Sequence, residues 1–284
     1  MEDQEEKLEL QRAREFGDII NDTFVFIKQN FGPLMRAYIT ICGFFLVAQI
    51  AVEIVSKLRD LDDGSAGSPF NASYWWSLLF TIVTASAITI TIYSYMALYR
   101  EKGKVAPTVT EVWGYFRYFF VRVFGAHIVV TLCIIAGFVM CVFPGIYLTP
   151  ILALVVPIMI MENASLNYSF NYSFRLIKEN WWFIFGLLII IFIIYYAGLA
   201  LVVLPGTIIS GGAEWVSGMK FNSSEIIVES VSMGIARIFY VVPCIAMALA
   251  YFSLSDQKHG TSLINRIQAL GKNPLSDDRS SEQY

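Results

Sequence analysis

Apolar residues fall into long runs separated by short polar segments. Six of these runs reach the roughly 20 residues that a helix needs to cross a hydrocarbon core about 30 Å thick. They lie at about 35–55, 74–99, 124–143, 145–162, 182–204 and 231–254. The pattern therefore predicts an all-α integral membrane protein with six transmembrane helices.

The third and fourth runs follow each other without a polar segment. From Phe124 to Met161 the chain contains no Asp, Glu, Lys or Arg. As one helix this stretch would measure roughly 57 Å, about twice the thickness of the hydrocarbon core. Pro144-Gly145 supplies a break, because proline does not continue a helix and glycine accepts a turn. We therefore expect a hairpin with its turn at Pro144.

Lysine and arginine are unevenly divided between the two sets of connecting segments. The segments before the first span and after the second, fourth and sixth spans hold sixteen, whereas the alternate loops hold three, Lys57, Arg59 and Lys220. Basic loops stay in the cytoplasm. We therefore predict a multi-pass protein of the bacterial inner membrane with both termini cytoplasmic. Its expected parts are an acidic cytoplasmic segment (1–15), a six-helix membrane domain (16–254) and a cytoplasmic tail (255–284) that is disordered from about residue 273.

Three connecting segments, 16–31, 109–123 and 165–180, have apolar side chains at spacings of three and four, as on one face of a helix. We expect three amphipathic interfacial helices parallel to the membrane plane, each followed by a transmembrane hairpin, and hence an internal repeat. Ordinary amphipathic connectors are the alternative. The second and third hairpins share a Pro-Gly pair at their expected turns, Pro144-Gly145 and Pro205-Gly206. The stripes are Phe16, Ile20, Phe24, Ile27 and Phe31; Val112, Phe116, Phe119 and Val123; and Leu166, Phe170, Phe174, Ile177 and Trp181.

Composition narrows the class of protein. Apolar residues make up 56% and charged residues 15% of the chain, against roughly 45–50% and about 25% in soluble domains. These values exclude a soluble enzyme and a disulfide-stapled secreted domain, and the net charge of −3 offers no basic field for a nucleic acid. The four cysteines lie inside apolar runs without a CxxC pair, as expected for membrane-core residues.

Catalytic and nucleotide-binding motifs are absent from the sequence. It contains two histidines and no HExxH, GxSxG, GxGxxG or GxxxxGK[ST] pattern. We therefore expect no enzymatic activity and no cofactor. The expected partners are membrane lipids and a membrane protein.

A few ionisable residues lie near the expected bilayer, where such residues are candidate functional sites. We predict that Glu53 and Arg237, at similar depths in the first and last spans, form an ion pair; the alternative is that Arg237 extends to the headgroups. His127 is expected to be a hydrogen-bonded histidine at the membrane interface, with a proton relay as the alternative. Glu162 closes the fourth span beside a helix N-terminus, with room for a cytoplasmic binding site formed with Arg36, Arg117 or Arg122.

Several stretches resemble an uncharacterised bacterial six-helix membrane family. They are FGDIINDTFVFIKQNF, VFPGIYL, PIMIMENASLNYSFNYSFRLIKENWW and GTSLINRIQALG, and the resemblance covers roughly residues 16–271. That family is related to the membrane domain fused to some glycerophosphodiester phosphodiesterases. The resemblance implies a location in the cytoplasmic membrane and no established chemistry. Phosphodiesterase activity does not carry over, because the sequence contains no soluble phosphodiesterase domain.

Three functions fit these observations. The first is a non-catalytic membrane module that organises lipid or a partner protein. The second is a transporter or channel for a small or lipid-like solute, in which Pro150, Pro157 and Pro243 open helices around a cavity. The third is an intramembrane enzyme. A cavity lined by Glu162 and arginines would favour the second or third function, whereas a dry, packed centre would favour the first.

Overall fold

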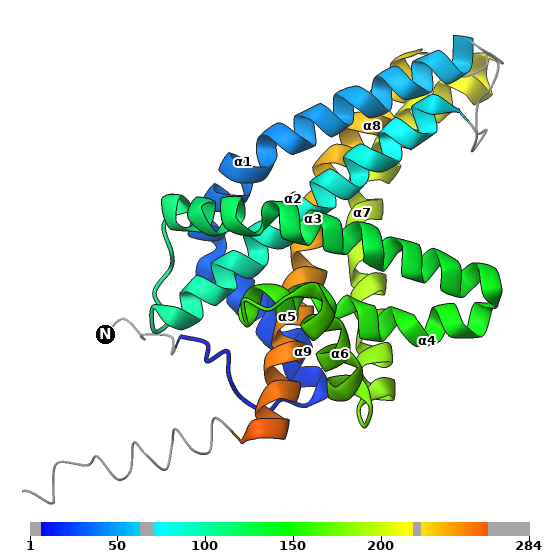
Figure 1. Cartoon of the computed structure of the whole chain (residues 1–284). Helices are drawn as coiled ribbons and strands as arrows, with labels where there is room; N and C mark the ends of the chain where they lie inside the picture. Colours follow the sequence, from blue (N-terminus) through cyan, green and yellow to red (C-terminus); the bar gives the residue numbers. More distant parts are fainter. Residues whose placement is uncertain (1–6, 63–70, 218–222, 261–284) are drawn as a thin grey trace, which may run out of the picture.

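The computed structural model describes residues 7–62, 71–217 and 223–260. Within these ranges the chain forms helices and loops, with no strand (Figure 1). The helices are α1 (Phe16–Asp62), α2 (Ala72–Glu101), α3 (Val109–Met140), α4 (Val142–Ala153), α5 (Val155–Met161), α6 (Leu166–Ile177), α7 (Trp181–Ser217), α8 (Ser223–Ala236), the 3-10 helix η1 (Arg237–Tyr240) and α9 (Val241–His259).

Six helical stretches in the described residues are long and apolar enough to cross a membrane, which agrees with the predicted number of spans. They are Phe16–Asp60, Ala72–Glu101, Val109–Met140, Val142–Met161, Trp181–Ile208 and Glu225–Lys258. The chain is therefore a polytopic membrane protein by the length and composition of its helices.

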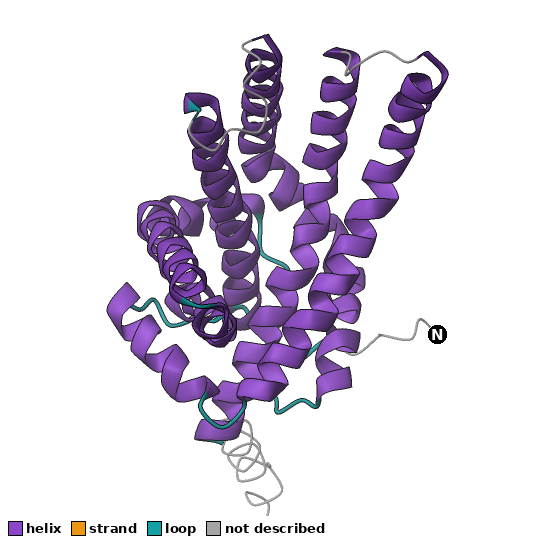
Figure 2. Ribbon diagram, turned by 90° about the vertical axis from the view of Figure 1, so that its right-hand side faces the viewer, coloured by secondary structure: helices purple, strands orange, loops and turns teal. Residues whose placement is uncertain are grey.

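Helices that follow each other along the chain form three hairpins, α1 with α2, α3 with α4, and α7 with α8, and α2 also packs closely against α3 (Figure 1). Figures 1 and 2 show that α1–α2 and α7–α8 extend toward the same end of the molecule, which we call the distal end. The α3–α4 pair projects in a different direction. α1 also packs against α8 and α9, so the first and last spans are neighbours, as predicted.

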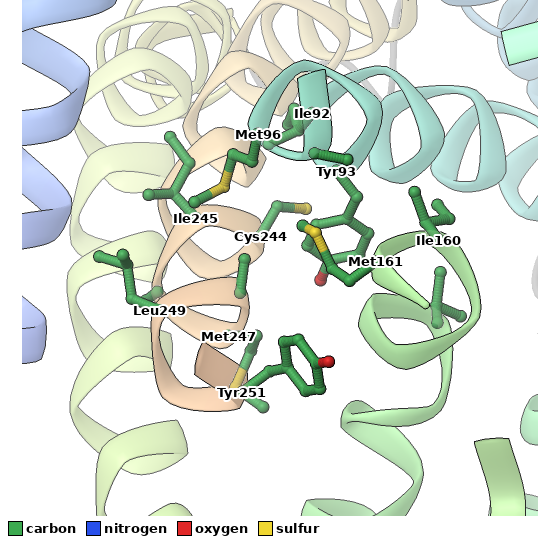
Figure 3. Close-up of a cluster of buried hydrophobic side chains, with 14 of the residues drawn as sticks. Ile92, Tyr93, Met96, Ile160, Met161, Cys244, Ile245, Met247, Leu249 and Tyr251 are labelled. Carbon is green, nitrogen blue, oxygen red and sulfur yellow. The ribbon is translucent and has the colours of Figure 1, made fainter. Parts of the chain in front are cut away.

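The core lies where α2, α5 and α9 meet (Figure 3). The second half of α2 is buried, all seven residues of α5 are buried, and most of α9 is buried. Side chains of Tyr93, Met96, Met161 and Cys244 come together here. α5 is apolar on all sides, whereas the buried half of α2 also carries hydroxyl side chains such as Thr89 and Ser94. Most of the large exposed apolar side chains lie on the helices around these three segments.

The turns differ from the prediction. The break between α3 and α4 is at Cys141, where the backbone is extended, and Pro144 lies in the first turn of α4. A proline is tolerated there because the first backbone N–H groups of a helix have no partner within it. Pro205 lies inside α7. A Pro-Gly pair thus does not mark the turn in either hairpin.

The three predicted amphipathic segments are helical, but only one is a separate helix. Residues 16–31 and 109–123 are the first parts of α1 and α3, continuous with the spans, and the third segment forms α6. The Val112 stripe is buried as expected, whereas Phe24 and Phe31 of the first stripe are exposed. The polar residues expected to face outward are exposed: Asn21, Asn167, Asn171 and Lys178. Their orientation relative to a membrane and the internal repeat remain predictions.

Residues 7–15 pack against the membrane domain. The Arg14 side chain is fully buried, and its Nε donates to Asp22 Oδ2 on α1 at 2.8 Å. The Arg14 backbone N–H donates to Ser253 Oγ on α9 at 2.9 Å. Leu8 and Leu10 are also buried. This segment therefore joins the start of α1 to the end of α9, while residues 261–284 of the predicted tail lie outside the described residues.

Candidate functional site

A cluster of charged side chains links α1 to α8 and η1 toward the distal end. Arg237 Nη2 lies 3.6 Å from Glu53 Oε2, with side-chain exposures of 21% and 15%. Lys57 Nζ lies 3.4 Å from Glu53 Oε1 and 3.2 Å from Glu229 Oε2. The predicted Glu53–Arg237 ion pair is therefore confirmed, within a four-residue network that also includes Lys57 and Glu229.

Backbone features place Arg237 opposite Glu53. Gly234 allows the close approach of α8 to α1, because a Cβ there would overlap the Ile50 side chain of α1. Two residues later α8 ends, and η1 begins at Arg237. Pro243 has no N–H for the carbonyl of Phe239, which accounts for the interruption of the helix at this point. The sixth span is thus two helices with Arg237 at the junction.

Several polar atoms near this cluster are buried without a hydrogen-bond partner among the described residues. They include Arg237 Nη1, Gln49 Oε1 and Ser230 Oγ. Gln49 lies one turn before Glu53 on α1, and its Nε2 donates to Thr81 Oγ1 on α2 at 2.8 Å. The interface of α1 with α2 and α8 is therefore unusually polar for a membrane bundle.

A second polar region is the loop between α5 and α6, which begins with Glu162. The Tyr251 hydroxyl on α9 donates to Glu162 Oε1 at 2.7 Å, and the charge of Glu162 raises the pKa of Tyr168 on α6. Arg100 on α2 donates to the Met161 carbonyl at 3.1 Å, and Arg122 on α3 donates to Asn163 Oδ1 at 3.1 Å.

This α5–α6 loop joins four helices, but it does not assemble the predicted basic site. Arg122 reaches the neighbour of Glu162 and not Glu162 itself. Arg36 and Arg117 are exposed on α1 and α3 and form no ion pair with another described residue. The side chains that approach Glu162 are tyrosines, which fits a structural role for this carboxylate.

The interior of the bundle holds a cavity of about 160 Å³. It lies where the break between α4 and α5 meets the break at η1, and its lining is mostly apolar. Its polar lining residues are Thr89, Tyr93, His127, Tyr240 and Cys244. Neither Glu162 nor any arginine lines it. His127 is hydrogen-bonded, as predicted: Nδ1 lies 3.1 Å from the Val123 carbonyl oxygen and 3.2 Å from Ser86 Oγ.

A surface groove of about 300 Å³ runs between α1 and α2 near the distal end. Apolar side chains, including Val52, Trp76 and Phe80, line most of it. Arg59, Ser56 and Ser73 also line it, and each lies closer than these apolar residues to the distal end of its helix. Arg59 is exposed and forms no ion pair with another described residue. The groove is thus apolar along its length and polar at one end, where Arg59 is exposed and Ser73 donates to the Asp60 carboxylate of α1.

Sequence reasoning missed Lys57, Glu229, Arg59 and the cavity residue Tyr240. The Glu53–Lys57 spacing of four residues on one helix was a usable signal. Tyr240 gave no signal, because its role depends on the break at η1. Among the described residues, no group of three His, Cys, Asp or Glu could hold a metal ion. Comparison with protein-family models, curated proteins and solved structures finds no match to this chain.

Proposed function

We propose that this polytopic membrane protein is a non-catalytic module that binds and organises lipid. The observation that carries the proposal is the groove between α1 and α2, which has apolar walls and the exposed Arg59 at one end. An anionic phospholipid has the complementary form, with its acyl chain along Trp76 and Phe80 and its phosphate at Arg59.

The charged residues elsewhere support a module without catalysis. Glu53, Arg237, Lys57 and Glu229 pair with one another, and Glu162 accepts a hydrogen bond from Tyr251. These contacts hold helices together, and no carboxylate, lysine or arginine lines the interior cavity. The proposal includes the bacterial cytoplasmic membrane, cytoplasmic termini and the relation to the six-helix family.

Lipid retention tests this function. The protein is reconstituted in nanodiscs of phosphatidylcholine and phosphatidylglycerol, extracted with mild detergent, and the bound lipid is measured by native mass spectrometry. We expect phosphatidylglycerol to be enriched. Arg59→Gln should lower its retention about fivefold, since one basic residue near an anionic lipid is worth about 1 kcal/mol. Arg36→Gln, which also removes an exposed arginine of α1, is the matched control. Equal retention of both lipids, or no effect of Arg59→Gln, would refute the proposal.

One observation favours a second function, a transporter or channel. The breaks at Leu154 and η1 border the same cavity, and interrupted helices around a cavity are typical of solute sites in transporters. A transport path requires water to reach this cavity. Cys244 lines it and is 2% exposed. In proteoliposomes of a Cys133→Ser/Cys141→Ser protein, a charged methanethiosulfonate reagent should modify Cys244 if a path exists, with buried Cys42 as the control.

A further inference from the structure

The interior cavity contains two hydrogen-bonding groups whose capacity the protein itself leaves unused. The first is on His127. The Val123 carbonyl oxygen accepts only, so its 3.1 Å contact with His127 Nδ1 places the proton on that nitrogen. Ser86 donates its own proton to the Ile82 carbonyl at 2.7 Å and is therefore free to accept from Nδ1 as well. In the neutral ring, Nε2 is then a hydrogen-bond acceptor.

The second unused group is the hydroxyl of Tyr240. No hydrogen bond joins it to another described residue, although its ring packs against Tyr195 at 5.9 Å between centroids. The other polar groups of the lining are engaged. Thr89 donates to the Ala85 carbonyl at 2.9 Å, and the Tyr93 hydroxyl has the Cys244 thiol as its polar neighbour in the lining. The cavity therefore offers one acceptor, His127 Nε2, and one donor, the Tyr240 hydroxyl.

The volume limits what the cavity can hold. At about 160 Å³ it is similar to an apolar cavity of about 150 Å³ in another protein that binds benzene. A six-membered ring therefore fits. A hydroxyl on that ring would satisfy both unused groups, because it accepts from Tyr240 and donates to His127. A charged group does not suit the site, since no charged side chain lines it.

The surroundings indicate how such a ligand arrives. Phe192 lines the cavity and is 38% exposed, so the cavity borders the surface of α7. Next to it on this helix, Ile189, Ile193 and Tyr196 are exposed. An apolar tail attached to the ring would lie along these side chains, in contact with lipid.

We propose that this cavity binds the neutral, hydroxyl-bearing ring of a membrane amphiphile, held by the Tyr240 hydroxyl and His127 Nε2. This site is separate from the groove at Arg59. Binding at this cavity does not depend on lipid binding in the groove at Arg59 or on transport of a solute.

Calorimetric titration in detergent tests the site with phenol, toluene and 4-hexylphenol as probes. Ala153→Leu, which fills the cavity from its lining, is measured in the same detergent to subtract partition into micelles. We expect one phenol per protein, bound about three- to tenfold more tightly than toluene, because toluene lacks the hydroxyl. 4-Hexylphenol should bind more tightly than phenol, because its tail contacts α7. Equal affinity of phenol and 4-hexylphenol would refute the membrane-amphiphile assignment.

Variants separate the hydrogen bond from general packing. Tyr240→Phe should remove most of the preference for phenol over toluene while leaving toluene binding unchanged. Tyr74→Phe is the matched control, because it removes an exposed hydroxyl of α2 outside the cavity lining and away from the proposed tail path on α7. Arg59→Gln should have no effect. The proposal is wrong if phenol binds no better than toluene in the wild-type protein, or if Ala153→Leu binds phenol as the wild-type protein does. Circular dichroism establishes that each variant is folded.

Discussion

At the scale of residues, Glu53, Lys57, Glu229 and Arg237 form a network of ion pairs within the first and last spans. An unpaired guanidinium in a membrane is costly, by about 2.5–3.5 kcal/mol at mid-membrane on insertion scales. Glu53 offsets this cost for Arg237 at 3.6 Å, and Lys57 connects Glu53 to Glu229. The network is asymmetric. Glu53 has two cationic neighbours, whereas Arg237 has one anionic neighbour.

This asymmetry predicts the outcome of a double-mutant cycle. Glu53→Gln should destabilise the protein more than Arg237→Gln, because it leaves Arg237 without a carboxylate while Arg237→Gln leaves Glu53 paired with Lys57. The double variant should be more stable than the sum of the single losses predicts, by about 0.5–3 kcal/mol. Thermal unfolding in detergent measures each variant, with Arg36→Gln as the control. Simple additivity of the two losses would show that the pair contributes nothing.

Glu162 makes a second residue-scale prediction. Tyr251→Phe removes the hydroxyl that donates to Glu162 at 2.7 Å from a side chain that is only 3% exposed. The partly buried carboxylate loses its donor, so we expect a loss of about 1–3 kcal/mol in the free energy of unfolding. Tyr168→Phe, at 45% exposure, should cost less. Chemical denaturation measures both free energies of unfolding. If Tyr251→Phe and Tyr168→Phe destabilise the protein equally, the loss does not come from the buried hydrogen bond between Tyr251 and Glu162.

At the scale of elements, small residues let the α3–α4 hairpin close. A Cβ on Gly137 would lie 3.1 Å from the backbone Cα of Gly145 on α4, four residues before the turn at Cys141. Backbone atoms have little freedom to move away, in contrast to the end of a flexible side chain. Close approach of this kind is common where membrane helices pack.

Gly137→Ala should therefore destabilise the hairpin, despite the better helix propensity of alanine. Gly125→Ala on the same helix is the matched control, because a Cβ there meets no atom within 4 Å. That control should be neutral or more stable by up to about 1 kcal/mol. Protease sensitivity between α3 and α4 and thermal unfolding report the difference. If both variants behave alike, the glycine contact has no structural importance.

The existence of the elements could be predicted from the sequence more fully than their boundaries. Six spans follow from the length of the apolar runs, because that length is fixed by the membrane. The turn at Cys141 could not be located, since Pro144 is as acceptable in the first turn of a helix as between helices. The same limit hid η1, which is an interruption within one apolar run.

On α1 and α6 most of the buried positions lie one residue before the apolar stripe that the sequence predicted. Ile177 of the predicted stripe is buried on α6, but the other buried positions there are Ser169, Tyr172, Ser173 and Leu176. The matching positions on α1 are Ile19, Asp22, Thr23 and Phe26, which are also buried. The two sets are separated by the 150 residues that separate the predicted copies. A search for apolar stripes does not find this face, because it includes polar residues such as Asp22, Thr23 and Ser169. The Glu53–Arg237 pair was predictable because depth in a span follows from counting residues, whereas the cavity depends on how α2, α3, α4, α5, α7, η1 and α9 meet.

At the scale of the whole molecule, the two ends of the described chain are tied together. Residues 7–15 bind to α9 through Ser253, and α1 packs against both α8 and α9. The first and last spans thus close the bundle, with Arg14–Asp22 at one end and Glu53–Arg237 at the other. The α3–α4 pair points elsewhere (Figure 2), so it is the part whose relation to the membrane is least constrained by the others.

Labelling of the natural Cys141 can show on which side of the membrane the turn between α3 and α4 lies. The sixteen-to-three distribution of basic residues predicts cytoplasmic termini and places the α3–α4 turn on the opposite side. Cys141 is exposed in the structure, whereas Cys42 and Cys244 are buried. An impermeant maleimide added to intact cells should therefore label Cys141. In a Cys141→Ser protein, Ser276→Cys in the tail should react only after permeabilisation. Labelling of Cys141 only after permeabilisation would mean that this hairpin does not cross the membrane, and would reduce the six crossings to four.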